Sequence, residues 1–143
     1  VGWAIECFVL SVINAVYQFV PKNINKYYQL KKYPNIFIAG QLSGVEGYIE
    51  SISSGLMCGI NMASYLKNEP LIHFGRKTLI GALSEYIASA DEKHFQPMNI
   101  NFGLFEGYSK KTKEASVERC LADIRTWKIH ILSSALEKNT LSC

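Results

Sequence analysis

Apolar residues recur at three- and four-residue steps through the middle of the chain. They are Val45, Tyr48, Ile49, Ile52, Leu56, Ile60 and Ala63. This spacing predicts an amphipathic helix over residues 45–66. The other side of that helix carries small side chains between Ser51 and Gly59. Glycine inside a helix costs about 0.5–1 kcal/mol relative to alanine, so we expect the backbone to approach a sheet or a cofactor closely there.

Two more helices follow from the same periodicity. Leu79, Leu83 and Ile87 mark the first, with Thr78 as its candidate N-cap. Residues 112–137 form the second, with an apolar stripe that passes through Trp127. We expect the loop between them, residues 90–105, to be functional, because long loops in compact proteins usually have a role.

A single strand is predicted before the central helix. Residues 36–39 form a short apolar run between Pro34-Asn35 and Gly40, as in a buried strand of a parallel sheet. Residues 21–33 are polar, basic and rich in tyrosine, and we expect a surface connection there. A short extended piece is possible at residues 71–75. One strand and three helices cannot close a parallel sheet, so the partner strands would have to come from elsewhere.

The first twenty residues are set apart by their strongly apolar character. A membrane helix is not favoured, because the segment carries Glu6 and lacks a basic flank. We therefore divide the chain into an atypical apolar segment at residues 1–20, which we expect to be foreign or to result from a shifted start, and a main part at residues 21–143.

Composition and charge exclude only a few classes of protein and partner. Apolar residues make up 48% of the 143-residue chain, which is typical of a globular protein and not of a disordered one. A net charge of +3 is too small to identify a nucleic-acid partner. The four cysteines are far apart, so neither a zinc site nor a redox pair is favoured, and a reducing cytoplasm is the expected compartment. We expect Cys58 to be a small buried residue.

The most informative motif is a glycine-rich turn directly before the central helix. It reads Gly40-Gln-Leu-Ser-Gly44-Val-Glu-Gly47-Tyr-Ile-Glu50. Such a turn presents backbone N–H groups at the positive end of a helix, which suits a phosphate or an electron-rich ring. The residues alone leave open an ordinary strand–turn–helix in which the glycines only shape the chain.

Together with Ser54-Gly-Leu-Met-Cys-Gly-Ile-Asn61, this motif resembles the last flavin-contacting motif of the folate- and FAD-dependent tRNA (uracil-5-)-methyltransferases, the TrmFO family. Two further stretches resemble the same family: Tyr28-Gln-Leu-Lys-Lys-Tyr-Pro34 and Phe95-Gln-Pro-Met-Asn-Ile-Asn-Phe-Gly-Leu104. The resemblance extends from about residue 20 to about residue 127. It is carried by the combined motifs, since the glycine spacing alone is weak evidence.

The resemblance implies an α/β fold: the α-rich C-terminal part of a glutathione-reductase-type, FAD-binding Rossmann fold, with its sheet incomplete in this chain. The implied activity is methylation of the T-loop uridine of tRNA at carbon-5. FAD is the implied cofactor, with NAD(P)H and 5,10-methylenetetrahydrofolate as cosubstrates. The sequence has no Gly-x-Gly-x-x-Gly, so the chain is expected to be a piece of the enzyme that needs a missing N-terminal region as partner.

Site residues are likewise implied by the resemblance. The flavin would be contacted by Gly40, Gln41, Gly44, Val45, Glu46, Gly47 and Tyr48. Folate or uridine would be contacted by His94, Asn99, Asn101, Phe102 and Gly103. The tRNA would be contacted by Arg76, Lys77, Lys110 and Lys111. The catalytic cysteines of the family lie upstream of this segment, so no catalytic residue is expected here, and no metal ligands are expected.

Several alternatives remain open at the level of sequence. The chain could be a non-catalytic remnant or a tRNA-binding module, or it could belong to the related flavoenzyme that modifies the wobble uridine of tRNA. Glu46 and Glu50 are four residues apart, a spacing that would pair carboxylates on one helical face or simply complement the positive helix end. The amides of residues 95–103 could read a pterin or uracil, or could satisfy backbone groups.

Overall fold

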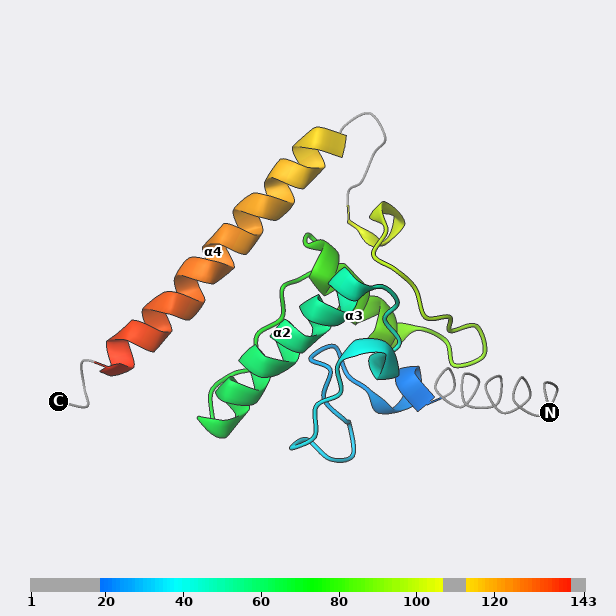
Figure 1. Ribbon diagram of the computed structural model, residues 1–143, viewed down its shortest axis with the longest axis horizontal. Helices are drawn as coiled ribbons and strands as arrows, with labels where there is room; N and C mark the ends of the chain where they lie inside the picture. The colour runs from blue at the N-terminus through cyan, green and yellow to red at the C-terminus, as the bar shows by residue number, and fades with distance from the viewer. Residues whose placement is uncertain (1–18, 107–112, 140–143) are drawn as a thin grey trace.

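The computed structural model describes residues 19–106 and 113–139. Residues 19–23 are helical. They are followed by the 3-10 helix η1 (Gly40–Ser43), the helices α2 (Tyr48–Leu66) and α3 (Leu79–Ser89), the 3-10 helix η2 (Phe102–Leu104) and the helix α4 (Lys113–Asn139). The helices α2 and α3 lie at the centre of the molecule, and α4 runs along one side (Figure 1). The α-rich character expected from the sequence is confirmed.

The predicted strand at residues 36–39 is wrong. Over the described ranges, residues 19–106 and 113–139, pairing is limited to three isolated bridges, one of them an antiparallel bridge between Gln29 and Phe37. Residues 71–75 also have no regular structure. A parallel strand needs a neighbouring strand to pair with, and the described part of the chain supplies none. The α-rich part of the expected fold is therefore present, whereas its sheet is not seen.

The segment at residues 21–33 is not the surface connection that its polarity suggested. Val20, Ile24 and Tyr28 are almost completely buried and form the core together with residues from α2, α3 and the loop after α3. Tyr28 has a left-handed backbone, with φ 62°, which brings the chain back on itself. Its N–H donates to the Asn25 carbonyl at 2.9 Å, and its own carbonyl accepts from the Ile38 N–H at 2.8 Å.

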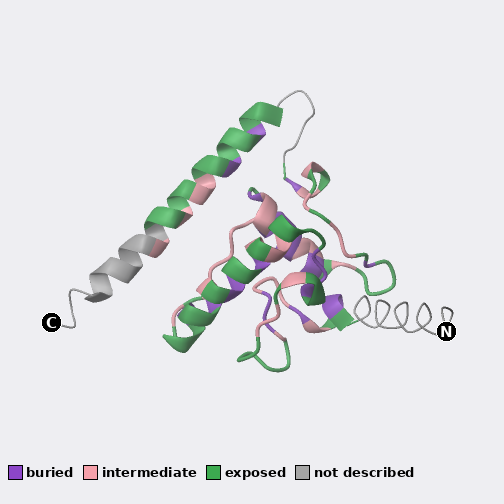
Figure 2. Ribbon diagram, in the orientation of Figure 1, coloured by how far each residue is buried: buried purple, intermediate pink, exposed green. Residues whose placement is uncertain are grey.

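The helix α2 is confirmed, but it begins at Tyr48, three residues later than predicted. The residues that it buries against the rest of the chain are mostly small or polar: Ser54, Met57, Cys58, Asn61 and Ser64. Most of its large aliphatic side chains, Ile49, Ile52, Leu56 and Leu66, are exposed to solvent. Buried residues therefore follow only the inner edge of α2 (Figure 2).

The two later helices are confirmed close to their predicted bounds. Thr78 caps α3, since its hydroxyl oxygen accepts from the Gly81 N–H at 3.0 Å. The helix α4 meets the body through an edge-to-face contact between Trp127 and Phe74, with ring centroids 5.6 Å apart. No helix within the described ranges is both long and apolar enough to cross a lipid bilayer.

Candidate functional site

The glycine-rich turn is built from left-handed residues. Gly40, Gly44 and Gly47 have φ values of 69°, 85° and 88°, a region that favours glycine because other residues meet a steric penalty there. Between them, η1 makes one tight turn that the Gly44 N–H closes by donating to the Gln41 carbonyl at 3.0 Å. The turn then delivers the chain into α2, whose N-cap is Gly47. A glycine has no side chain that could cap the first helical turn.

The Ser54 side chain ties the turn to α2. Its hydroxyl oxygen accepts from the Gly40 N–H at 2.9 Å, and its proton is donated to the Ser51 carbonyl at 2.9 Å. The Ser43 hydroxyl donates to the Gly40 carbonyl at 2.7 Å. Both serines are buried, so these bonds fix the start of the turn against the helix.

The turn has one closed side and one open side. A Cβ atom placed on Gly44 would lie 2.5 Å from Phe95 Cζ and 3.0 Å from Val20, so the chain itself fills the space beside Gly44. A Cβ on Gly40 would meet nothing within 4 Å, and Gln41 and Tyr48 are exposed. The turn is therefore closed at Gly44 and open to solvent at Gly40.

The loop after α3 lies against this turn. Val45 and Met98 form a parallel bridge, and the Glu46 N–H donates to the Met98 carbonyl at 3.1 Å. Asn99 Oδ1 is 3.2 Å from the position of a Cβ on Gly47. The structure thus brings together the two regions that the sequence singled out separately.

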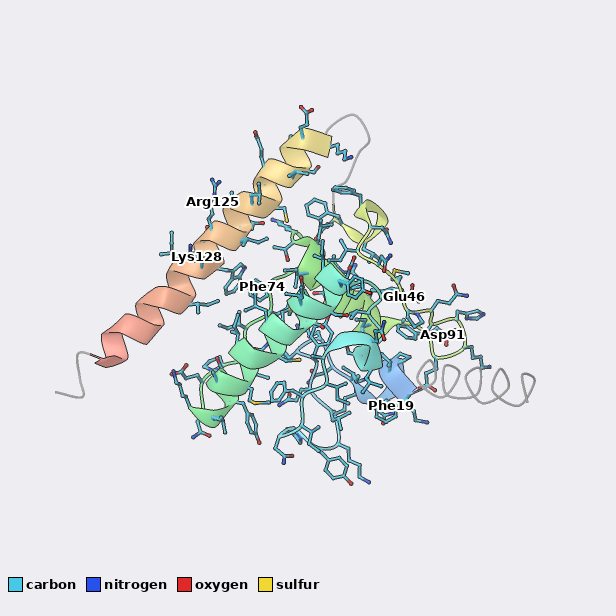
Figure 3. All side chains as sticks on the ribbon, viewed as in Figure 1. Phe19, Glu46, Phe74, Asp91, Arg125 and Lys128 are labelled. Carbon is cyan, nitrogen blue, oxygen red and sulfur yellow. The ribbon has the colours of Figure 1, made fainter. Side chains whose placement is uncertain are left out.

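The two glutamates have different surroundings. Glu50 lies in the first turn of α2, where its Oε1 accepts from the Ile100 N–H at 3.0 Å. Glu46 precedes the helix and is exposed, so the expectation that both lie on one helical face is wrong. Figure 3 labels Glu46 and, on the same side of the molecule, Asp91, which follows the end of α3.

The predicted folate or uridine residues are divided between two places. His94 lies near Asp91, with 2.5 Å between His94 Nδ1 and Asp91 Oδ2, and both side chains are exposed. This hydrogen bond lowers the pKa of Asp91 below its usual value. Asn101 caps η2 by accepting from the Gly103 N–H at 2.9 Å, and the Lys113 ammonium lies 5.3 Å from the centre of the Phe102 ring.

Of the predicted tRNA contacts, Arg76 and Lys77 are exposed neighbours in the chain with different partners. The Arg76 guanidinium is paired with Glu85 at 2.5 Å. Lys77 lines a small cavity beside α4 together with Arg119 and Asp123. Lys110 and Lys111 lie outside the described residues.

A histidine that the sequence did not single out is held in a polar cluster. His73 Nδ1 accepts from the Gly75 N–H at 3.2 Å, and its Nε2 lies 3.4 Å from Ser84 Oγ and 3.6 Å from Glu85 Oε1. Burial lowers its pKa, although Glu85 opposes the shift. Ser84 donates its proton to the Gly81 carbonyl at 2.9 Å, so His73 is not positioned to activate it as a nucleophile. Nothing in the sequence around His73 signals this packing.

The two described cysteines, Cys58 and Cys120, are free and buried. Burial raises the pKa of the Cys58 thiol to about 11, and its sulfur lies 3.5 Å from the Ile38 carbonyl oxygen. The expectation of a small buried residue at position 58 is confirmed. Within the described ranges no group of three histidine, cysteine or acidic side chains could hold a metal ion.

These observations define one chemically useful place, the outer side of the turn at the start of α2. Backbone N–H groups at a helix start favour a partner with negative charge. The backbone is open at Gly40, where an added Cβ would meet nothing within 4 Å, whereas the Glu50 carboxylate and Asn99 occupy the space beside Gly47. The carboxylates of Glu46 and Glu50 would repel an anion bound at this place. The charge of Glu50 is partly compensated, because its Oε1 accepts a hydrogen bond from the Ile100 N–H.

Comparison with known proteins gives two findings. Residues 10–70 match the family described as glucose inhibited division protein A, and this match begins inside the apolar N-terminal segment. The chain is 48% identical over 115 residues to proteins named methylenetetrahydrofolate–tRNA-(uracil-5-)-methyltransferase TrmFO from Streptococcus pneumoniae strains Hungary19A-6, G54 and R6. Each match covers 76% of this chain and 26% of the relative. The chain thus spans about a quarter of the length of these curated relatives.

Proposed function

The chain belongs to the TrmFO group of the GidA-like flavoproteins, and from this premise we propose that it supplies the flavin-facing C-terminal part of a folate-dependent tRNA (uracil-5-)-methyltransferase. The observation that carries the proposal is the 48% identity to TrmFO proteins. A match over 76% of 143 residues includes the turn at residues 40–48 wherever it begins. The turn therefore lies within the region aligned with proteins named for this activity.

The outer side of the turn fits a flavin ring. Gly40 leaves open space beside the backbone, whereas the space beside Gly47 is taken by the Glu50 carboxylate and by Asn99, so the ring would lie at the Gly40 end of the turn. Gln41 and Tyr48 are exposed beside it, where they can contact the cofactor. Gly44 and Val45 face the core, so their part is to shape the turn and to present backbone groups.

The chain's own groups would hold the ring and favour its negatively charged edge. Amides at the start of α2 favour negative charge through their partial positive charge and the helix dipole. Asn99, beside Gly47, can offer an amide to a pterin or uracil at the same edge. When bound, reduced FAD would take part in transfer of the one-carbon unit from methylenetetrahydrofolate, and NAD(P)H would re-reduce it.

The remaining functions would come from polypeptide that corresponds to the unmatched part of the relatives. That part would contribute the phosphate-binding glycines and the catalytic cysteines. Basic residues of this chain, including Lys77 and Lys113, would add tRNA phosphate contacts. The cytoplasm is the proposed compartment.

Two measurements test the proposal. The 143-residue polypeptide alone should bind FAD weakly in a fluorescence titration and should not methylate tRNA, because it has no Gly-x-Gly-x-x-Gly. A chimera of the S. pneumoniae relative that carries this chain's matched residues should retain FAD and form 5-methyluridine. A folded chimera that binds no FAD would refute the proposal.

A further inference from the structure

The positive charge of the chain is concentrated before the glycine-rich turn. Residues 19–45 contain four lysines and no acidic residue. The whole chain has 15 lysines and arginines and 12 acidic residues, which gives the net charge of +3. Without these four lysines the chain would have eleven basic and twelve acidic residues. The excess of positive charge therefore belongs to this one segment.

The segment folds back on itself and brings its lysines together. The Lys31 N–H donates to the Asn23 carbonyl at 2.8 Å. The Lys31 ammonium donates to the Pro21 carbonyl, also at 2.8 Å. Because Pro21 and Asn23 flank Lys22, these two bonds place Lys22 beside Lys31 and Lys32, nine to ten residues later in the chain.

Tyrosine rings lie among these lysines. The Lys26 ammonium is 5.4 Å from the centre of the Tyr27 ring, and the Lys32 ammonium is 5.3 Å from the centre of the Tyr33 ring. Residues 31–36 are all exposed, and their loop projects from the lower edge of the body (Figure 1). We define the lysine–tyrosine surface by the basic and aromatic side chains of this fold-back: Lys22, Lys26, Tyr27, Lys31, Lys32 and Tyr33.

No carboxylate balances this surface within residues 19–106 and 113–139. The ion pairs of the described ranges all lie between residues 73 and 94. Like charges held close together repel one another, and an external anion would relieve that repulsion. Lysine ammonium groups bind phosphates as point charges, and an exposed tyrosine ring can stack on an unpaired base. The combination is typical of a surface that contacts RNA.

A lipid bilayer fits this surface less well. Segments that lie in a membrane interface combine basic residues with a large apolar face. The exposed loop at residues 31–36 instead consists of Lys-Lys-Tyr-Pro-Asn-Ile, in which Ile36 is the one aliphatic side chain and is 43% exposed. RNA is therefore the partner that the side chains favour.

We propose that the lysine–tyrosine surface binds the tRNA substrate, with its lysines at phosphates and Tyr33 stacked on an unpaired base. The inference rests on the proposed function, since the relatives are named for tRNA. It assigns the contact to a surface other than Arg76, which is paired with Glu85. Seven residues span at most about 25 Å, so tRNA held at Tyr33 lies within that distance of Gly40 and the turn.

The test measures binding of the 143-residue chain to a fluorescently labelled tRNA transcript by anisotropy, at several KCl concentrations between 50 and 200 mM. The lysine variant carries Lys22→Gln and Lys32→Gln. The matched control carries Arg125→Gln and Lys128→Gln, which remove the same charge from exposed positions of α4, labelled in Figure 3. Tyr33→Ala and Tyr33→Phe test stacking. Circular dichroism verifies that each variant keeps its helices.

We expect the lysine variant to bind tRNA at least fivefold more weakly at 100 mM KCl, and the control to change by less than twofold. The slope of log affinity against log salt should fall by about 1.5 in the lysine variant, because each phosphate contact contributes about 0.7–0.9. Tyr33→Ala should bind at least about fivefold more weakly with an unchanged slope. Tyr33→Phe should restore the affinity, because it keeps the ring.

Three results would overturn the inference: no tRNA binding by the wild-type chain, equal losses in the lysine variant and the control, or tighter binding to phosphatidylglycerol vesicles than to tRNA. The S. pneumoniae chimera separates this inference from the proposed function. A chimera that forms no 5-methyluridine, together with lost tRNA affinity in the lysine variant, refutes the proposed function and leaves the surface standing. A methylating chimera with unchanged affinity in the lysine variant overturns the surface alone.

Discussion

Replacing Gly44 with alanine should destabilise the chain more than the same change at Gly40. Both residues are left-handed, with φ values of 85° and 69°, so each substitution incurs the backbone penalty of about 1–2 kcal/mol, reduced by the lower entropy of the unfolded alanine chain. Gly40 has open space around it, and we expect Gly40→Ala to cost about 1 kcal/mol. Gly40→Ala therefore serves as the control, because it measures the cost of the left-handed backbone alone.

At Gly44 a steric term is added. The new methyl group would lie 2.5 Å from Phe95 Cζ, about 1 Å inside ordinary van der Waals contact. Phe95 is buried and stacked on Tyr86, with ring centroids 5.7 Å apart, so the ring cannot turn away freely. Overpacking of this kind costs about 1–3 kcal/mol, and Gly44→Ala should therefore lose about 2–4 kcal/mol in total.

Urea unfolding followed by circular dichroism measures both losses. Adding Phe95→Leu completes a double-mutant cycle, and the shorter side chain should recover about 1 kcal/mol or more in the Gly44→Ala background. Equal losses at Gly40 and Gly44, or strict additivity in the cycle, would refute the conclusion that Phe95 closes the inner side of the turn.

Three further predictions follow from buried polar groups. Asn61→Leu should cost about 2–5 kcal/mol in urea unfolding, because both backbone groups of Ile72 lose their partner; a loss below 1 kcal/mol would contradict this role. The pKa of His73 is lowered by burial, so its contribution to stability should be complete above about pH 6.5 and should be lost as the pH falls below that value. His73→Gln should flatten the dependence of the unfolding midpoint on pH; a slope equal to that of the unsubstituted chain would reject the assignment. Cys58, with a pKa of about 11, should react with iodoacetamide at pH 8 only after denaturation, and rapid labelling of the native chain, located by peptide mass spectrometry, would disprove its burial.

The helices could be predicted because their signals are local. The spacing of Leu79, Leu83 and Ile87 and the cap at Thr78 specify α3 without any distant contact. The start of α2 was predicted too early because Val45 continues the helical periodicity. The Val45 backbone instead pairs with Met98, more than fifty residues away. Such a distant contact cannot be predicted from the residues around Val45.

The predictions of a strand at residues 36–39 and of a surface connection at residues 21–33 were wrong for a related reason. Residues 36–39 have the composition of a buried strand, but pairing needs neighbours that the described part of the chain does not supply. Tyr28 was assigned to a surface because lysines surround it, yet its left-handed backbone places the ring in the core. Polarity averaged over a segment does not show which single side chain turns inward.

The candidate site was predictable in part. The glycines at positions 40, 44 and 47 indicated a turn before the central helix, and the structure has that turn, with positive φ at all three glycines. The sequence could not show that Phe95 would fill the space beside one of them, since this depends on how the loop after α3 folds back. The cofactor and substrate contacts remain predictions.

The hydroxyl of Ser54 connects two helices. Ser54 lies within α2, and its oxygen accepts a hydrogen bond from the N–H of Gly40, the first residue of η1. A rotation of α2 about its axis by a few degrees would therefore displace the Gly40 N–H, and the first residue of η1 with it.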